Sequence, residues 1–381
     1  MLKNKIYKYF SIEIGKSFFT ILFAFTAIAW TVRAVNFLDL IVEDGYSVSI
    51  YLYYSFLNIS TIITRFIPLS FLLALVISIL KFERQNELII LWTVGLSKIQ
   101  AVRLFLYIAT LVTILQIFLA VIITPSALNK SRSLLKNSDL KSFTSVIKTN
   151  DFSDSFQYIT FYVEEKNNQN EMKNIFIRDE SNSLNTIISK SGDTTNTTII
   201  ADKGMIKNNK LILFDGVIQS QNKDNIIKNI NFSKTELSIN KFKTRTITLP
   251  KIQETSTLIL LSCFVNKNYF FINPQQCTYS ENKKEVTQQI SRRIGMPTYI
   301  PLVSLIVSFL LVYKKKKKYI FLNKYIYFII SFFILVLAEI MVRYSGFSKL
   351  NTVLYFTFPF ILMPIIYWVL SRSLSKEKKT R

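Results

Sequence analysis

Six apolar runs of membrane-spanning length divide this chain, with three before and three after a long polar insert from about Thr124 to Met296. A helix needs ~20 residues to cross the hydrocarbon of a bilayer. The pattern therefore predicts two membrane halves, residues 1–123 and 297–381, around one folded domain at 124–296. The six runs are Phe18–Leu38, Thr61–Leu80, Leu104–Ile123, Pro297–Tyr313, Tyr319–Val342 and Thr352–Leu370.

The charge pattern predicts how the spans are oriented. The chain has 47 Lys and Arg and a formal net charge of +23, which in a soluble protein would suggest nucleic acid binding. Here the basic residues concentrate in alternate loops, whereas Asn36–Asn58 contains no Lys or Arg. Positive residues stay on the cytoplasmic side, so we expect both termini in the cytoplasm, an exported insert and no nucleic acid partner. The basic loops and ends hold Lys3, Lys5, Lys8, Lys16, Lys81, Arg84, Lys98, Arg103, Lys314–Lys318, Arg372, Lys376, Lys378, Lys379 and Arg381.

The first span is too long and too aromatic for a secretory signal, so we expect it to be retained. The Lys314–Lys318 run is interpreted as a topology anchor, with contact to anionic membrane lipids as the alternative.

The insert is predicted to be β structure. Short β-branched and aromatic runs alternate with Asn, Asp, Gly and Lys turns, which indicates seven or eight strands in an open or rolled antiparallel sheet. The stretch MIKNNKLILF at 205–214 predicts a tight hairpin, and FDGV at 214–217 predicts a second turn. Two interpretations stay open for the sheet: a solvated cap or a groove that holds lipid.

The segment 256–276 follows the strands and is too short and too polar to cross a bilayer. It predicts a packed or interfacial helix. Cys263 and Cys277 fall in this exported part of the chain, where a disulfide is permitted, but their number and spacing exclude a zinc site.

Catalytic motifs are lacking. The chain has no His, so general base catalysis loses its usual agent. The fragment IGKS at Ile14–Ser17 lacks the first Gly of a phosphate-binding loop and has no preceding strand. We therefore expect a protein that is not an enzyme, binds no cofactor or metal of its own, and depends on a partner for energy.

The cytoplasmic loop KFERQNELIILWTVGLSK at 81–98 is the predicted attachment point for that partner. A helix over residues 83–97 would place Glu83 and Glu87 on one face at i,i+4. It would also form a neighbouring apolar stripe. Gly95 is expected to end the helix and Ser97 to cap the next one. The alternative is a helix that lies on lipid headgroups. The predicted stripe consists of Leu88, Leu91 and Trp92.

Ionisable residues inside the spans mark a candidate binding site, because charges in hydrocarbon are costly. Arg33 is the first candidate for contact with an anionic substrate, and Arg65 and Arg343 are the others. Two alternatives stay open. Glu339 and Arg343 can neutralise each other at i,i+4, and Arg65 near a helix end can extend to the interface.

Three segments carry a resemblance to a known family. NELIILWTVGLS at 86–97, IPLSFLLALVISILKF at 67–82 and FLDLIVEDGYS at 37–47 are similar to the LptF/LptG permeases of the bacterial lipopolysaccharide exporter. Asn86 stands where that family usually has Ser, and Trp92 and Val94 replace smaller residues. The FLDLIV and GLSK segments are closer to the LptF side, and the resemblance covers essentially the whole chain.

The resemblance implies a permease that takes lipopolysaccharide from the outer leaflet of the inner membrane. It implies a homologous LptG-like permease and a cytoplasmic LptB-like ATPase that binds ATP and Mg. It also implies β-jellyroll domains that pass the lipid to LptC-like and LptA-like periplasmic proteins. Glu87 and its neighbours would couple to the ATPase, and Arg33 on the first span would contact the lipid. The alternatives are a lipoprotein-release or efflux permease, and a membrane-anchored assembly scaffold that transports nothing.

Overall fold

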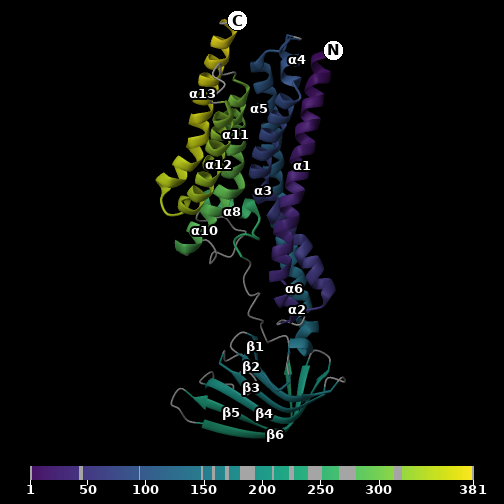
Figure 1. Cartoon of the computed structure of the whole chain (residues 1–381). Helices are drawn as coiled ribbons and strands as arrows, with labels where there is room; N and C mark the ends of the chain where they lie inside the picture. Colours follow the sequence, from purple (N-terminus) through teal and green to yellow (C-terminus); the bar gives the residue numbers. More distant parts are fainter. Residues whose placement is uncertain are drawn as a thin grey trace. The chain divides into compact units, whose positions relative to one another are not determined.

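The computed structural model describes most of the chain and divides it into two compact units (Figure 1). The helical unit comprises Met1–Val32, Asn58–Asn129 and Lys251–Arg381, and the sheet unit comprises Arg33–Leu57 and Lys130–Pro250. The described residues are 2–42, 46–93, 95–146, 149–156, 159–167, 171–180, 194–207, 210–222, 227–238, 251–265, 280–312 and 320–379.

Within these described ranges, six helical segments are long and apolar enough to cross a membrane, as the sequence predicts. Their ends lie further out than expected. Helix α1 (Leu2–Asn36) has 35 residues and α3 (Val48–Arg84) has 37, which correspond to about 52 and 55 Å of helix. Both exceed the ~30 Å of hydrocarbon, because each helix begins well before the predicted apolar run, α1 at Leu2 and α3 at Val48. The six segments are Lys5–Val42, Val48–Arg84, Lys98–Leu135, Lys283–Leu311, Tyr325–Ser345 and Lys349–Ser375.

The third and fourth spans contain irregular turns. Helix α5 (Lys98–Phe118) passes through a π-helix, η1 (Leu119–Ile123), into α6 (Thr124–Val146). The fourth span is built from five pieces, partly because Pro297 lacks the backbone donor that a regular helix needs. These pieces are α10 (Ser280–Ile290), η3 (Ser291–Gly295), η4 (Met296–Thr298), α11 (Tyr299–Val307) and η5 (Ser308–Leu311). The remaining helices are α2 (Asp39–Val42), α4 (Glu87–Thr93), α8 (Thr257–Val265), α12 (Ile320–Ser345) and α13 (Lys349–Lys379).

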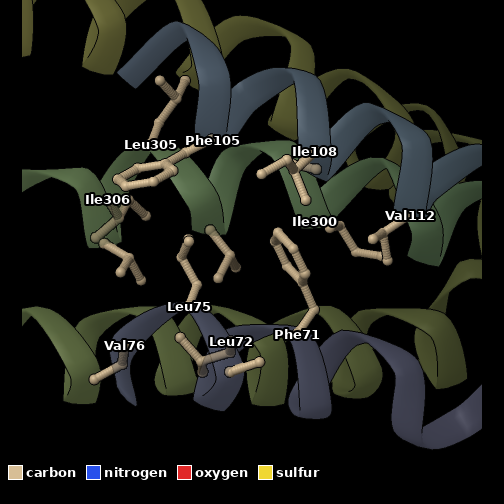
Figure 2. Packing of buried hydrophobic residues seen from close by; sticks show 14 of the residues in the cluster. Phe71, Leu72, Leu75, Val76, Phe105, Ile108, Val112, Ile300, Leu305 and Ile306 are labelled. Carbon is tan, nitrogen blue, oxygen red and sulfur yellow. The ribbon is translucent and has the colours of Figure 1, made fainter. Parts of the chain in front are cut away.

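Helix α11 is the centre of the helical unit, since all nine of its residues are buried. Figure 2 shows Phe71 and Leu75 of α3, together with Phe105 of α5, meeting Ile300 and Leu305 of α11. In Figure 1 the two chain ends lie at the same end of the helical unit as α4. This agrees with an even number of spans between the termini.

The insert forms one antiparallel sheet of six described strands, in which each strand pairs with the next in sequence. Its buried face follows the alternation of the strands. In one row across the sheet, Phe161 pairs with Ile177, Ile177 with Ile199, and Ile199 with Ile218. The strands are β1 (Phe152–Phe156), β2 (Ile159–Lys166), β3 (Glu171–Asp179), β4 (Thr194–Lys207), β5 (Lys210–Asn222) and β6 (Ile227–Ser238).

The predicted hairpin is confirmed, because Lys207 of β4 pairs with Lys210 of β5 across a two-residue connection. The predicted turn at 214–217 is wrong. Asp215 has φ 49°, but Phe214 and Gly216 stay paired with β4 on one side and β6 on the other. Strand β5 therefore continues through this single left-handed residue. One predicted strand, NTIISK at 185–190, lies outside the described residues.

The helix predicted after the sheet is confirmed for α8. Leu260 is buried against Val286 and Ile290 of α10. The rest of that segment, including Cys277 of the permitted disulfide, lies outside the described residues, as does the Lys314–Lys318 run.

Candidate functional site

The helix in the loop at 81–98 is shorter than predicted. Helix α4 covers only Glu87–Thr93. Asn86 before it has φ 60°, a left-handed conformation that Asn tolerates. This conformation separates α3, which ends at Arg84, from α4. Glu83 and Glu87 therefore lie on different helices, and the prediction that they share one face of a helix over 83–97 was wrong.

The turns after α4 follow the sequence prediction. Gly95 has φ 93°, and the N–H of Leu96 donates to the carbonyl of Leu91 at 3.1 Å. This is the Schellman geometry that ends many helices. At the start of α5 the N–H of Ser97 donates to Oε1 of Gln100 at 3.1 Å, one half of a capping box. The predicted helix end at Gly95 and helix start at Ser97 are confirmed.

The apolar faces of α4 are arranged differently from the prediction. Leu88 is buried, and Leu91 and Trp92 pack partly buried against the chain's own core. The exposed apolar side chains are Ile89 and Ile90, which are 60% and 58% exposed. The sequence offered a signal for them, because a run of five large apolar residues cannot fit on one side of a short helix.

The Glu87 carboxylate has a partner that the sequence did not indicate. The hydroxyl of Tyr9 on α1 donates to its Oε1 at 3.1 Å. The Tyr9 ring lies 5.9 Å from the Phe10 ring and 6.2 Å from the Phe82 ring, centroid to centroid. Tyr9 of α1 therefore fixes the first residue of α4 by a hydrogen bond, and its own ring packs in an aromatic cluster.

Glu339 on α12 pairs with a different arginine from the one predicted. Nη2 of Arg292 in η3 lies 2.5 Å from its Oε1. The expected pair with Arg343 is wrong, because the fourth span brings Arg292 to the carboxylate first. The side chain of Arg343 is exposed, and its backbone carbonyl accepts a hydrogen bond from Nε2 of Gln288 at 2.6 Å.

Two hollows meet around Arg292. One is a cavity of about 60 Å³ whose lining includes Arg65, Gln116 and Glu339. The other is an open cleft of about 540 Å³ whose lining includes Arg343. Arg292 lines both. The structure thus brings two of the three predicted substrate-contacting arginines to one polar region of the helical unit.

The wall of the smaller cavity has unused hydrogen-bonding capacity. Nε2 of Gln116 donates to the carbonyl of Thr64 at 3.1 Å. Within the described part of the chain, its Oε1, the hydroxyl of Thr61 and Nε of Arg292 have no hydrogen-bond partner. Buried polar atoms of this kind are normally satisfied by water or a ligand. At about 60 Å³ the cavity has room for water but not for an acyl chain.

Arg33, the first candidate for substrate contact, lines neither hollow. It is half-buried in the last turn of α1 and belongs to the sheet unit. Arg65 and Arg343 belong to the helical unit.

The sheet unit has a charged cleft of about 950 Å³ at one end of its strands. Burial lowers the pKa of Lys166 in this cleft. Lys173 donates to Glu165 at 2.8 Å, which lowers the pKa of that carboxyl. The sequence prediction named no site residue in this cleft, because its lining comes mainly from β2, β3, β4, β5 and the residues before β1, which only the sheet register brings together. No group of three or more His, Cys, Asp or Glu side chains in the described ranges could hold a metal ion.

Comparison with known proteins agrees with this architecture. No curated protein matches the chain. The family model for the lipopolysaccharide export system permease LptF/LptG matches residues 8–373, which include the sheet and all six spans except the outermost residues of the first and the last. The chain therefore belongs to the LptF/LptG family and is a transmembrane subunit of a lipopolysaccharide transporter, in which a partner supplies the ATPase.

Proposed function

We propose that this chain is the LptF-side permease of the exporter. The FLDLIV segment at 37–42 and the GLSK segment at 95–98 support this assignment over the LptG side. An LptG-like permease would be its membrane partner, and LptC-like and LptA-like proteins would receive lipopolysaccharide from the sheet unit. ATP and Mg would bind to the LptB-like ATPase, with no cofactor in this chain.

The proposed topology is an inner-membrane protein with cytoplasmic termini and a periplasmic sheet. The chain ends and α4 share one end of the helical unit (Figure 1). The sequence around that end is rich in Lys and Arg, which membrane insertion retains in the cytoplasm. The sheet is inserted between the third and fourth spans, so an odd number of crossings separates it from the N-terminus.

The observation that carries the proposed coupling is the outward face of α4. Ile89 and Ile90 offer exposed apolar side chains there, and the partly exposed Glu87 stands at the start of the same helix. A helix of this kind suits a groove on another protein. Leu88, Leu91 and Trp92 fix α4 to the transmembrane core, so movement of the ATPase would pass through them into the spans.

The proposed lipid contacts are Arg33, Arg65 and Arg343. Arginine binds phosphate and carboxylate through a planar fork of donors, and lipopolysaccharide carries such groups beside its acyl chains. The polar region around Arg292 supports a contact for Arg65 and Arg343. Arg33 would act at a separate position on the first span.

The test is affinity purification of the tagged chain from native membranes in mild detergent. Mass spectrometry should recover a homologous six-span protein, an ATPase and bound lipopolysaccharide. Glu87→Ala should reduce recovery of the ATPase, whereas Glu83→Ala on α3 should reduce it less. Recovery of periplasmic proteins without an ATPase would contradict the proposal and favour a scaffold.

A further inference from the structure

The chain returns from the sheet to the membrane through a folded turn, Lys251–Ser256, that leads into α8. The N–H of Glu254 donates to the carbonyl of Lys251 at 2.8 Å, and the N–H of Lys251 donates to Oε2 of Glu254 at 3.1 Å. The hydroxyl of Thr255 donates to the carbonyl of Ile252 at 2.6 Å. Hydrogen bonds within the return segment itself therefore fix its conformation.

Arg293 in η3 of the fourth span holds this turn. The residue is only 5% exposed. Nη2 donates to the carbonyl of Gln253 at 2.8 Å, and Nη1 donates to the carbonyl of Thr255 at 3.0 Å and to the hydroxyl of Thr257 at 2.8 Å. All three acceptors are neutral oxygens. The rigid guanidinium fork can therefore hold three points of the return segment in one geometry.

Thr257 extends the contact to the third span. Its side chain is 2% exposed, and its hydroxyl accepts from Arg293 while it donates to the carbonyl of Val121 at 3.0 Å. A hydroxyl has this double capacity. Val121 lies in η1, so the chain of hydrogen bonds runs from the π-helix of one span, through Thr257, to the π-helix of the next.

Both spans depart from regular helix at the places where they receive these bonds. Single π turns occur frequently at functional sites, and irregular segments are where a helix changes direction most readily. The π-helices η1 and η3 are therefore suited to respond to a pull on the return segment.

We propose that Arg293 and Thr257 form a return clamp that transmits movement between the sheet and the third and fourth spans. The proposal rests on the proposed function, and it makes both side chains positioning residues for the hand-over of lipopolysaccharide. Displacement of the return segment would shift η1 and η3 together, because one hydroxyl joins them. Breaking the clamp would leave ATP hydrolysis intact and reduce the lipid transferred for each ATP.

The test uses the complete exporter in proteoliposomes of phospholipid and lipopolysaccharide, with ATP hydrolysis and lipid transfer measured together. Thr257→Val keeps the shape of the side chain and removes the hydroxyl. Arg293→Lys keeps the charge and removes the fork. Each should lower the transfer-to-hydrolysis ratio by at least about fivefold, the factor for the loss of one hydrogen bond worth about 1 kcal/mol. Thr257→Ser should restore the ratio.

The matched control is Thr110→Val on α5, since that hydroxyl donates only within its own helix, to the carbonyl of Tyr107 at 2.8 Å. It should leave the ratio unchanged. The clamp is refuted if Thr257→Val and Arg293→Lys keep the wild-type ratio. It is also refuted if they lower hydrolysis, transfer and Tm in parallel, which a purely structural role would produce. If the wild-type complex moves no lipopolysaccharide at all, the proposed function itself fails.

Discussion

The hydroxyl of Tyr9 and the carboxylate of Glu87 are 78 residues apart in the chain and 3.1 Å apart in the fold. This contact joins the N-terminal part of α1 to the first turn of α4. It limits the positions of the carboxylate while leaving Glu87 partly exposed. A carboxylate has acceptor capacity for more than one donor, so Glu87 can keep the Tyr9 bond and still accept a second donor, as the proposed coupling to an ATPase requires.

Tyr9→Phe is expected to weaken the affinity of the permease complex for its ATPase by about fivefold. The change removes one hydrogen bond worth about 1 kcal/mol and keeps the ring packed on Phe10 and Phe82. Titration of the ATPase onto the complex in nanodiscs measures this effect. Tyr107→Phe on the exposed face of α5 is the control. Equal affinities for wild type and Tyr9→Phe would show that Tyr9 does not position Glu87.

Substitutions of the exposed and of the buried side chains of α4 should have different effects. Ile89→Ser combined with Ile90→Ser should leave the protein level and Tm unchanged and should lower ATPase recovery, because these side chains are exposed. Leu88→Ala should lower the free energy of unfolding by about 2–4 kcal/mol, because it removes buried volume from the core. Thermal unfolding and co-purification of the same variants separate the two effects. A lower Tm for the double serine variant would contradict the exposure assigned to Ile89 and Ile90.

The sequence predicted the membrane architecture because hydrocarbon thickness imposes a length that can be counted. It missed the helix ends, since α1 and α3 continue well beyond the apolar runs that the length rule identifies. It also predicted a turn at Asp215, where a left-handed residue was fitted into a continuous strand. Local turn signals do not reveal that pairing on both sides of a strand can outweigh them.

The candidate site was harder to predict for the same reason. The i,i+4 rule placed Glu83 with Glu87, but the rule holds only if the helix is continuous, and Asn86 interrupts it. The rule also paired Glu339 with Arg343, although Arg292 from another span reaches the carboxylate. Contacts between distant segments have no local signal. The helix end at Gly95 was predictable because its cause, a left-handed glycine, is local.

The Arg292–Glu339 pair should show a favourable coupling energy of about 1 kcal/mol in a double-mutant cycle. Arg292→Gln or Glu339→Gln alone leaves one charge without its partner, whereas the double change leaves two neutral amides. The side chains are 27% and 47% exposed, so solvent reduces the effect below that of a fully buried pair. The cycle compares the Tm values of the wild type, the two single variants and the double variant in nanodiscs. Additive losses would show that the pair contributes nothing to stability.

Gly216→Ala is expected to destabilise the sheet by about 1–3 kcal/mol, the usual cost of overpacking. A Cβ at this position would collide with the backbone carbonyl of Ile200 and lie 2.6 Å from Cζ of Phe232. The carbonyl cannot move without breaking the β4–β5 ladder. Gly15→Ala on α1 is the matched control, since nothing lies within 4 Å of its added Cβ, and Ala favours a helix by roughly 0.5–1 kcal/mol over Gly. Thermal unfolding followed by far-UV circular dichroism should therefore give a lower Tm for Gly216→Ala and a higher Tm for Gly15→Ala. A higher Tm for Gly216→Ala would mean that Phe232 does not cover β5.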